Sequence, residues 1–347
     1  MVVYRFFLSG MLAMATIKDV AELAKVSRTT VSRVLGGNSY VNAATKKRVL
    51  EAIENLDYTP SAIAMSLKAK RSKSVAVVVP NMRNQIFVMI VRGAEDEARK
   101  RGYMVVLCNT NESEEVERRY VEKLQDNWVD GFVFATGRTD PTCLRALREK
   151  NIPAVVTVRT SGSSVDMVGI DNYQASRTAV GYLLKTGHKR IAIVNRPRSI
   201  PLYRERFFGY ADAIHDAGGR IEERLVIEET DYAGNVYSKM LQLLQSGTVP
   251  DAVFATSDMR AIHAMRAILD FGLKIPGDIS LVGMDNIKIS SLIEPPLTTV
   301  SLPLYEMGGI AMARLIHQIE NGMPDFASVE LLPTTLIVRK STRYSAL

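Results

Sequence analysis

Short apolar runs alternate with amphipathic stretches over residues 74–341, and this alternation restricts the fold more than any other feature. The apolar runs are 75–79, 104–108, 131–135, 154–158, 191–195, 252–255 and 280–284. The amphipathic stretches are 87–101, 116–127, 175–186, 206–217, 237–245 and 260–271. Such alternation predicts strands and helices that form doubly wound parallel sheets with right-handed crossovers. About seven strand–helix units over about 270 residues predict two sheets.

The residues that follow the apolar runs are candidates for a binding site, because ligands of such sheets bind outside the carboxyl ends of the strands. They are polar or cationic: Arg83, Asn84, Arg138, Arg159, Arg196, Arg198, Ser257, Asp258, Asp285 and Asn286. The sequence holds no GxGxxG, Walker or GxSxG motif, and its four histidines lack metal-ligand spacing. Hydrogen-bonding groups without a nucleophile–base pair favour binding over catalysis. We therefore predict no catalytic residue, no metal site and no cofactor.

The positive charge of the chain is confined to its first fifth. Residues 1–73 contain 12 Lys or Arg and 5 Asp or Glu, a difference of +7, whereas residues 74–347 contain 32 of each. A basic module predicts a polyanionic partner. No apolar run reaches the ~18–20 residues that a membrane-spanning helix needs. Cys108 and Cys143 are predicted to be reduced packing residues, which is typical of a cytoplasmic protein.

Residues 16–59 read as three short helices. Thr16, with an acid three residues on, is typical of a helix start, and Ser27 can cap a second helix over 28–35. A third helix starts near Asn42 and runs to Tyr58. Two short helices joined by a tight turn, with a third that closes the core, predict a helix-turn-helix. From this pattern alone, a protein-binding three-helix unit is an alternative.

The second helix has the side chains that read DNA. Its polar face presents Arg28, Thr29, Ser32 and Arg33. Arginine can bind guanine bidentately, while threonine and serine can touch base edges or phosphates. Residues at helix ends and turns are candidates for the phosphate contacts that fix register. These candidates are Thr16, Asn38, Thr45 and Lys46.

Two stretches of this module carry a family resemblance. TIKDVAELAKVSRTTVSRVL at 16–35 and TKKRVLEAIENLDYTPSAIAMSLK at 45–68 resemble the DNA-binding headpiece of the lactose-repressor/galactose-repressor (LacI/GalR) family. The resemblance implies that Arg28, Thr29 and Arg33 read bases. It also implies a hinge over residues 60–73, where Leu67 enters the minor groove as a wedge and the small Ala64 allows close approach. The complete set of predicted DNA contacts is Thr16, Arg28, Thr29, Thr30, Ser32, Arg33, Asn38, Thr45, Lys46, Tyr58, Ser61, Ala64, Leu67 and Lys68.

The large module resembles the core of the same family and, more distantly, periplasmic sugar-binding proteins. The matching stretches are VGIDN, GHKRIAIV, RFFGYADAI, PDAVFATSD, IPGDISLVGMDN, PPLTTV and LLPTTLIVRKST. The resemblance implies two subdomains, at about 74–170 with 302–330 and about 171–301 with 331–341, and a chain that crosses between them three times. It implies effector contacts from Phe87, Arg159, Arg206, Ser257 and Asp285. The strand-end positions Asn84, Arg138 and Asp258 complete the predicted effector site.

Two departures from the family pattern concern the effector. Many members have Asn-Pro-Phe-Phe where this chain has residues 84–87, and an Asp where it has Val158 before Arg159. The loss of an acid beside retained arginines indicates an anionic ligand, such as a sugar acid or sugar phosphate. A neutral sugar, a nucleoside or a purine are the alternatives.

These observations predict a sequence-specific transcriptional regulator, most simply a repressor, that binds a near-palindromic operator in double-stranded DNA as a homodimer. The eight residues after Arg339 cannot form the leucine heptads that make tetramers of some family members. Residues 1–15 are predicted to be a disordered extension or an upstream-start artefact. They also imitate a secretory signal, so the alternative is a periplasmic-type sugar receptor.

Overall fold

The structure, a computed structural model, describes residues 15–36, 41–58, 71–126, 128–135, 141–158, 166–230 and 235–343. The chain divides into two compact units, Met1–Ser72 and Lys73–Leu347. No helix within the described ranges is long and apolar enough to span a membrane.

The first unit contains three helices, α1 (Ile17–Leu23), α2 (Arg28–Leu35) and α3 (Ala43–Asn55). Each begins after a side-chain cap: Thr16 forms a capping box with Asp19, and Ser27 and Asn42 cap the other two helices. The valines Val20, Val31 and Val49 are fully buried where the helices meet. The helix-turn-helix predicted from the sequence is therefore confirmed.

The second unit is built on two sheets, each of six strands within the described residues. The first sheet is parallel throughout, in the order β11-β5-β4-β3-β1-β2. Its strands in chain order are β1 (Ser74–Val79), β2 (Met104–Asn109), β3 (Phe132–Phe134), β4 (Ala154–Thr157), β5 (Asp166–Ile170) and β11 (Val329–Leu332). We call this sheet and its helices the N-lobe.

The second sheet has the order β12-β10-β9-β8-β6-β7 and is parallel except for the β10–β12 pair. Its strands are β6 (Ile191–Asn195), β7 (Val226–Glu228), β8 (Ala252–Ala255), β9 (Ser280–Asp285), β10 (Thr298–Ser301) and β12 (Thr335–Ile337). We call this sheet and its helices the C-lobe. The predicted fold class, a helical headpiece with two doubly wound subdomains, is confirmed.

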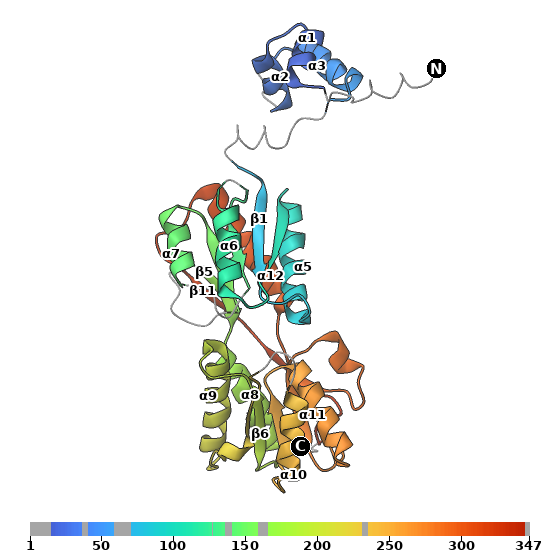
Figure 1. Cartoon of the computed structure of the whole chain (residues 1–347), viewed down its shortest axis with the longest axis vertical. Helices are drawn as coiled ribbons and strands as arrows, with labels where there is room; N and C mark the ends of the chain where they lie inside the picture. Colours follow the sequence, from blue (N-terminus) through green and yellow to red (C-terminus); the bar gives the residue numbers. More distant parts are fainter. Residues whose placement is uncertain are drawn as a thin grey trace, which may run out of the picture. The chain divides into compact units, whose positions relative to one another are not determined.

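Helices cover both faces of each sheet (Figure 1). The N-lobe helices are α5 (Gln85–Lys100), α6 (Glu114–Leu124), α7 (Pro141–Glu149) and α12 (Leu304–Asn321). The C-lobe helices are α8 (Asn172–Lys185), α9 (Pro201–Asp216), α10 (Val236–Gln245) and α11 (Asp258–Asp270). Because side chains alternate along a strand, Val77 packs into the core that holds Ile90 of α5, while Val78 packs into the core that holds Leu147 of α7.

The chain crosses between the lobes three times: after β5, between β10 and α12, and between β11 and β12. The predicted subdomain limit at 330/331 falls inside β11, and the crossing lies at residues 333–334. Ligands that bind outside the carboxyl ends of both sheets can therefore lie where the lobes meet.

Helices α5 and α12 approach each other unusually closely. A Cβ added at Gly93 would lie 2.0 Å from the carbonyl oxygen of Tyr305, and one at Gly308 would lie 2.0 Å from that of Ile90. Only glycine fits at these two crossing points. The contact fixes the position of α5, whose first turn contains Phe87.

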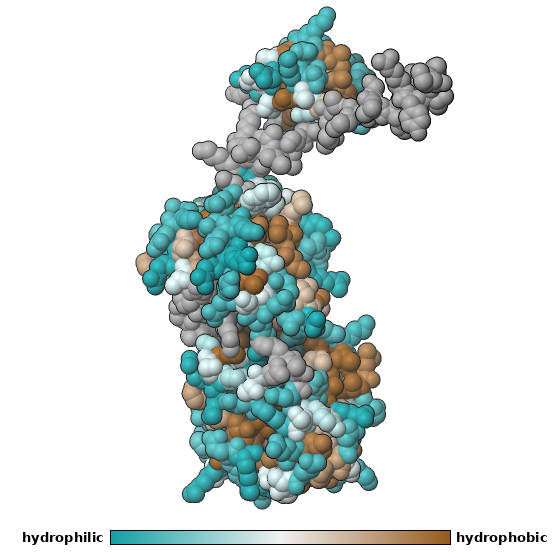
Figure 2. Space-filling view, in the orientation of Figure 1, coloured by the Kyte–Doolittle hydropathy of each residue, from teal (hydrophilic) through white to brown (hydrophobic). Residues whose placement is uncertain are grey.

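Most of the surface seen in Figure 2 is hydrophilic, with separate apolar patches. One patch lies on the C-lobe at the 3₁₀ helix η2 (Lys288–Ser291) and the loop after it. There Leu292 is 71% exposed and Ile289 is 39% exposed. A patch of this kind on a monomer is typical of an interaction surface.

Candidate functional site

Helix α2 presents a polar, basic face. Arg28, Thr29 and Arg33 are exposed, while Val31 and Val34 on the opposite side are buried. The predicted base readers therefore share one accessible face.

The remaining described DNA-contact candidates lie near the ends of helices, except Ser32, which lies in the middle of α2. Thr30 is half-buried, and its hydroxyl lies 2.9 Å from that of the cap residue Ser27. Thr16, Ser32, Thr45, Lys46 and Tyr58 are exposed or half-buried. The predicted contacts Asn38, Ser61, Ala64, Leu67 and Lys68 lie outside the described residues.

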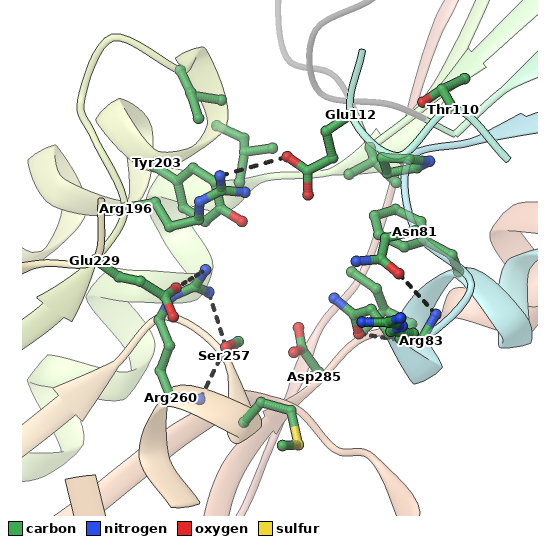
Figure 3. Close-up of a pocket in the computed structure, with 18 of the residues that line it drawn as sticks. Asn81, Arg83, Thr110, Glu112, Arg196, Tyr203, Glu229, Ser257, Arg260 and Asp285 are labelled. Carbon is green, nitrogen blue, oxygen red and sulfur yellow. Dashed lines mark hydrogen bonds and ion pairs between the residues drawn. The ribbon is translucent and has the colours of Figure 1, made fainter. Parts of the chain in front are cut away.

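A cavity of about 570 Å³ lies between the two lobes of the second unit. Figure 3 shows its walls: Asn81, Arg83, Thr110 and Glu112 come from the N-lobe, and Arg196, Tyr203, Glu229, Ser257 and Arg260 from the C-lobe. The volume suits a sugar or a nucleoside. We call this cavity the cleft.

The structure brings together five of the eight predicted effector contacts, namely Asn84, Phe87, Arg206, Ser257 and Asp285. Asn84 caps α5 by accepting from the Ile86 amide, which places the ring of Phe87 one residue later against the cleft. Ser257 caps α11 in the same way from the C-lobe. Arg138 and Arg159 lie outside the described residues.

Arg206 is buried and lines the cleft. Its Nε donates to Asn172 Oδ1 at 2.8 Å, and its NH1 donates to the carbonyl oxygen of Thr256 at 2.6 Å. Burial lowers the pKa of Arg206 and Asp285 opposes this shift, but a guanidinium stays charged in proteins. Its charge is therefore fixed in position before any ligand enters.

Tyr203 is surrounded by arginines. The guanidinium carbons of Arg260, Arg196 and Arg206 lie 5.2, 5.5 and 5.7 Å from the centre of its ring. Burial raises the pKa of Tyr203, but the three positive charges outweigh burial and lower the pKa overall. The ring and the arginines form one face of the cleft.

Two of these arginines are already paired with carboxylates. Arg260 NH2 lies 2.7 Å from Glu229 Oε2, and Arg196 NH2 lies 3.5 Å from Glu112 Oε2. Among the described residues that line the cleft there are four arginines and five Asp or Glu side chains. The described part of the cleft therefore carries no excess of arginines over acidic side chains. Arg138 and Arg159 lie outside the described residues, so the anionic ligand stays a prediction.

Asp258 is placed differently from the prediction. Its carboxylate is buried and accepts from the Thr299 hydroxyl at 2.5 Å and from the Ile287 amide at 2.9 Å. It is not among the residues that line the cleft. As the first residue of α11 it turns back onto β10, so it supports the site from behind the residues that line the cleft.

Strained backbone marks both sides of the cleft. Val158 has φ 69° at the end of β4, and Asp285 has φ 121° at the end of β9. A positive φ is costly for a β-branched residue and uncommon for aspartate. Burial raises the pKa of Asp285 and the nearby Asp258 raises it further, against the arginines. Both residues face the same cavity.

The sequence-based effector set omitted several lining residues: Asn81, Glu112, Arg196, Tyr203, Glu229 and Arg260. Arg196 carries a detectable signal, because it directly follows an apolar run. Glu229 follows β7, a strand of three residues that produces no clear pattern. Arg260 lies two residues inside α11, beyond the strand ends where candidates are sought.

Within the described ranges, no group of three His, Cys, Asp or Glu side chains is placed to hold a metal ion. The cleft contains fixed hydrogen-bonding groups, an aromatic ring from each lobe and paired charges. This arrangement can bind and orient a polar ring.

Two family descriptions match the chain. Residues 16–61 match "Bacterial regulatory proteins, lacI family", and residues 72–336 match "Periplasmic binding proteins and sugar binding domain of LacI family". The chain belongs to the LacI family and is a DNA-binding transcriptional regulator, not an enzyme.

Relatives of the whole chain support this assignment. The chain is 35% identical to the ribose operon repressor of Halalkalibacterium halodurans, over 95% of this chain and 98% of that one. A structure of the lac repressor dimer bound to operator and the anti-inducer ONPF matches with a TM-score of 0.84 at 29% identity, over 94% and 99% of the two chains. A complex of the regulator CelR with cellobiose matches with a TM-score of 0.71 at 32% identity, over the same shares.

Proposed function

We propose that the protein is a repressor that binds a near-palindromic operator as a homodimer and responds to a neutral, polyhydroxylated ring compound in the cleft. The observation that carries the proposal is the combination of a basic, exposed α2 face with a cleft of balanced charge. Because its proposed target is DNA, we also propose that the protein acts in the cytoplasm.

The proposed homodimer rests on exposed apolar residues in both lobes. In the C-lobe these are Ile289 and Leu292, and in the N-lobe they are Met104 and Leu107 on the edge strand β2. Unpaired edge strands and apolar patches are surfaces that proteins cover. The similar lac repressor is a dimer on its operator, and a two-fold dimer reads a palindrome because each headpiece contacts one half-site.

The proposed effector class follows from the cleft. A sugar hydroxyl can donate to a carboxylate and accept from an arginine at once, so paired charges suit a neutral polyol. The apolar face of a sugar ring can pack on Phe87 or Tyr203. Two relatives point the same way, one a ribose operon repressor and one a cellobiose complex.

Two measurements on the full-length protein test the proposal. Selection of binding sites from random DNA should return a near-palindrome, and a shorter, unpaired site would contradict the dimer. A thermal-shift screen should then identify a neutral sugar that stabilises the protein and changes its operator affinity. The screen should include sugar acids, sugar phosphates, nucleosides and purines, and a response to these alone would refute the neutral class.

A further inference from the structure

The two ion pairs in the cleft carry an inference about selectivity. We propose that Glu229 and Glu112 are specificity-determining residues that occupy two of the four arginines in the described cleft lining, Arg260 and Arg196, and so disfavour anionic ligands such as sugar phosphates and sugar acids at the C-lobe wall. This inference rests on the proposed function, because it concerns which effectors the same cleft accepts. Figure 3 shows both carboxylates reaching the arginines of the C-lobe wall.

The Glu229–Arg260 pair lies within one lobe. Glu229 follows β7 and Arg260 lies in the first turn of α11, so both members of the pair belong to the C-lobe. The side chain of Arg260 is 10% exposed and that of Glu229 is 12% exposed. The remaining terminal nitrogen of Arg260 donates to Ser257 Oγ at 2.9 Å. An incoming anion would have to displace a buried carboxylate to reach this guanidinium.

The Glu112–Arg196 pair joins the two lobes. Glu112 follows β2 of the N-lobe and Arg196 follows β6 of the C-lobe, and their side chains are 17% and 11% exposed. An anion that took the place of Glu112 on Arg196 would break a contact across the cleft. Anionic ligands are therefore opposed twice, by repulsion from the carboxylates and by loss of an interlobe ion pair.

Arg206, a buried arginine of the cleft, does not offer an open anion site either. Two of its nitrogens are bonded to Asn172 and to the carbonyl oxygen of Thr256. Burial lowers its pKa, and the nearby Asp285 partly opposes this shift. A neutral polyol avoids these conflicts, because its hydroxyls can bond to either member of each pair without displacing the other. The carboxylates thus reject one ligand class and help to bind another.

The decisive variant is Glu229→Gln in the full-length protein, titrated calorimetrically with inorganic phosphate and with D-ribose 5-phosphate at constant ionic strength. The unmodified protein should show no saturable binding in the millimolar range. The variant should bind at least about tenfold more tightly, because a guanidinium without its carboxylate becomes available for a charge-assisted hydrogen bond. Adding Arg260→Gln to the same variant should abolish the gain.

Glu228→Gln is the matched control. Glu228 is the neighbour of Glu229 and also pairs with an arginine, but its partner Arg198 is 43% exposed and neither residue lines the cleft. It should therefore give no gain in phosphate binding. If Glu229→Gln fails to fold without phosphate, Glu112→Gln serves as the second variant, since its pair is longer and less buried.

Three results would overturn the inference: cleft binding of phosphate by the unmodified protein as tight as by the variant, equal gains with Glu228→Gln, or no gain in either cleft variant. Operator binding and the sugar response are measured on the same unmodified protein. If those two are present while the gain is absent, only the inference on selectivity fails. If operator binding itself is absent, the proposed function fails, whatever the result of the phosphate titrations.

Discussion

Replacement of Gly308 by alanine tests the close contact between α5 and α12. The new Cβ would lie 2.0 Å from the carbonyl oxygen of Ile90 and 2.8 Å from its carbonyl carbon. These are backbone atoms that cannot rotate away, so the helices must separate by about 1 Å to reach even the tightest contacts found in proteins. Such overpacking costs ~1–3 kcal/mol.

Helix propensity partly offsets this cost, because alanine is favoured over glycine in a helix by ~0.5–1 kcal/mol. We therefore expect Gly308→Ala to lower the free energy of unfolding by about 1–2 kcal/mol, measured by urea denaturation with circular dichroism. Separation of the helices would also displace Phe87, so affinity for the effector should fall as well.

Gly309→Ala is the matched control. It is the next residue of α12, but the nearest atom to its added Cβ is the carbonyl oxygen of Gly93 at 3.7 Å, an ordinary contact. This variant should gain up to ~1 kcal/mol from helix propensity alone. Equal stabilities of Gly308→Ala and Gly309→Ala would refute the argument from close packing.

Three further predictions concern the headpiece and the cleft. Arg33→Ala should cost ~1–3 kcal/mol of operator affinity and relax base preference at one half-site position, measured by binding to a set of single-base operator variants. Arg206→Lys should weaken effector binding about tenfold or more in calorimetry, because lysine lacks the planar guanidinium whose Nε and NH1 donate to Asn172 and to the Thr256 carbonyl. Asp258→Asn should gain stability relative to the unmodified protein as the pH rises from 4.5 to 7.5, in paired urea denaturations.

The sign of the last prediction follows from the pKa. Burial is the main factor that raises the pKa of Asp258, so the native state holds this proton more tightly than the unfolded chain does. The stability it contributes is present below the unfolded value of about 3.9 and is lost as the pH rises through the folded pKa. Asparagine does not titrate, so the variant does not lose stability in this way as the pH rises. A difference in the free energy of unfolding between Asp258→Asn and the unmodified protein that stays constant across this pH range would contradict the expectation. Unchanged base preference in Arg33→Ala would contradict the prediction for the headpiece, and unchanged effector affinity in Arg206→Lys would contradict the prediction for the cleft.

The sequence predicts the parts of the fold that have a strong local pattern. Helix α2 begins and ends where the sequence places it, because Ser27 caps it and the apolar spacing is regular. Helix α12 has no such signal, because Gly308 and Gly309 lower its helix propensity. Gly308 is explained only by the partner helix α5, which the sequence does not place beside it.

The site is partly predictable for a similar reason. The rule that ligands bind after parallel strands finds Ser257 and Asp285, since both directly follow or end strong apolar runs. It also selects Asp258, because it does not tell which way a side chain turns. The pairing of Glu229 with Arg260 joins residues 31 positions apart, and no local pattern indicates it.

The three crossings between the lobes have a consequence for the inheritance of this protein. Each lobe is assembled from separated stretches of the gene, so a single recombination break cannot transfer a complete lobe from one family member to another. A functional exchange of the C-lobe would need residues 171–301 and 335–343 to be replaced together. New effector specificities are therefore expected to arise by point changes in the cleft more readily than by shuffling of lobes.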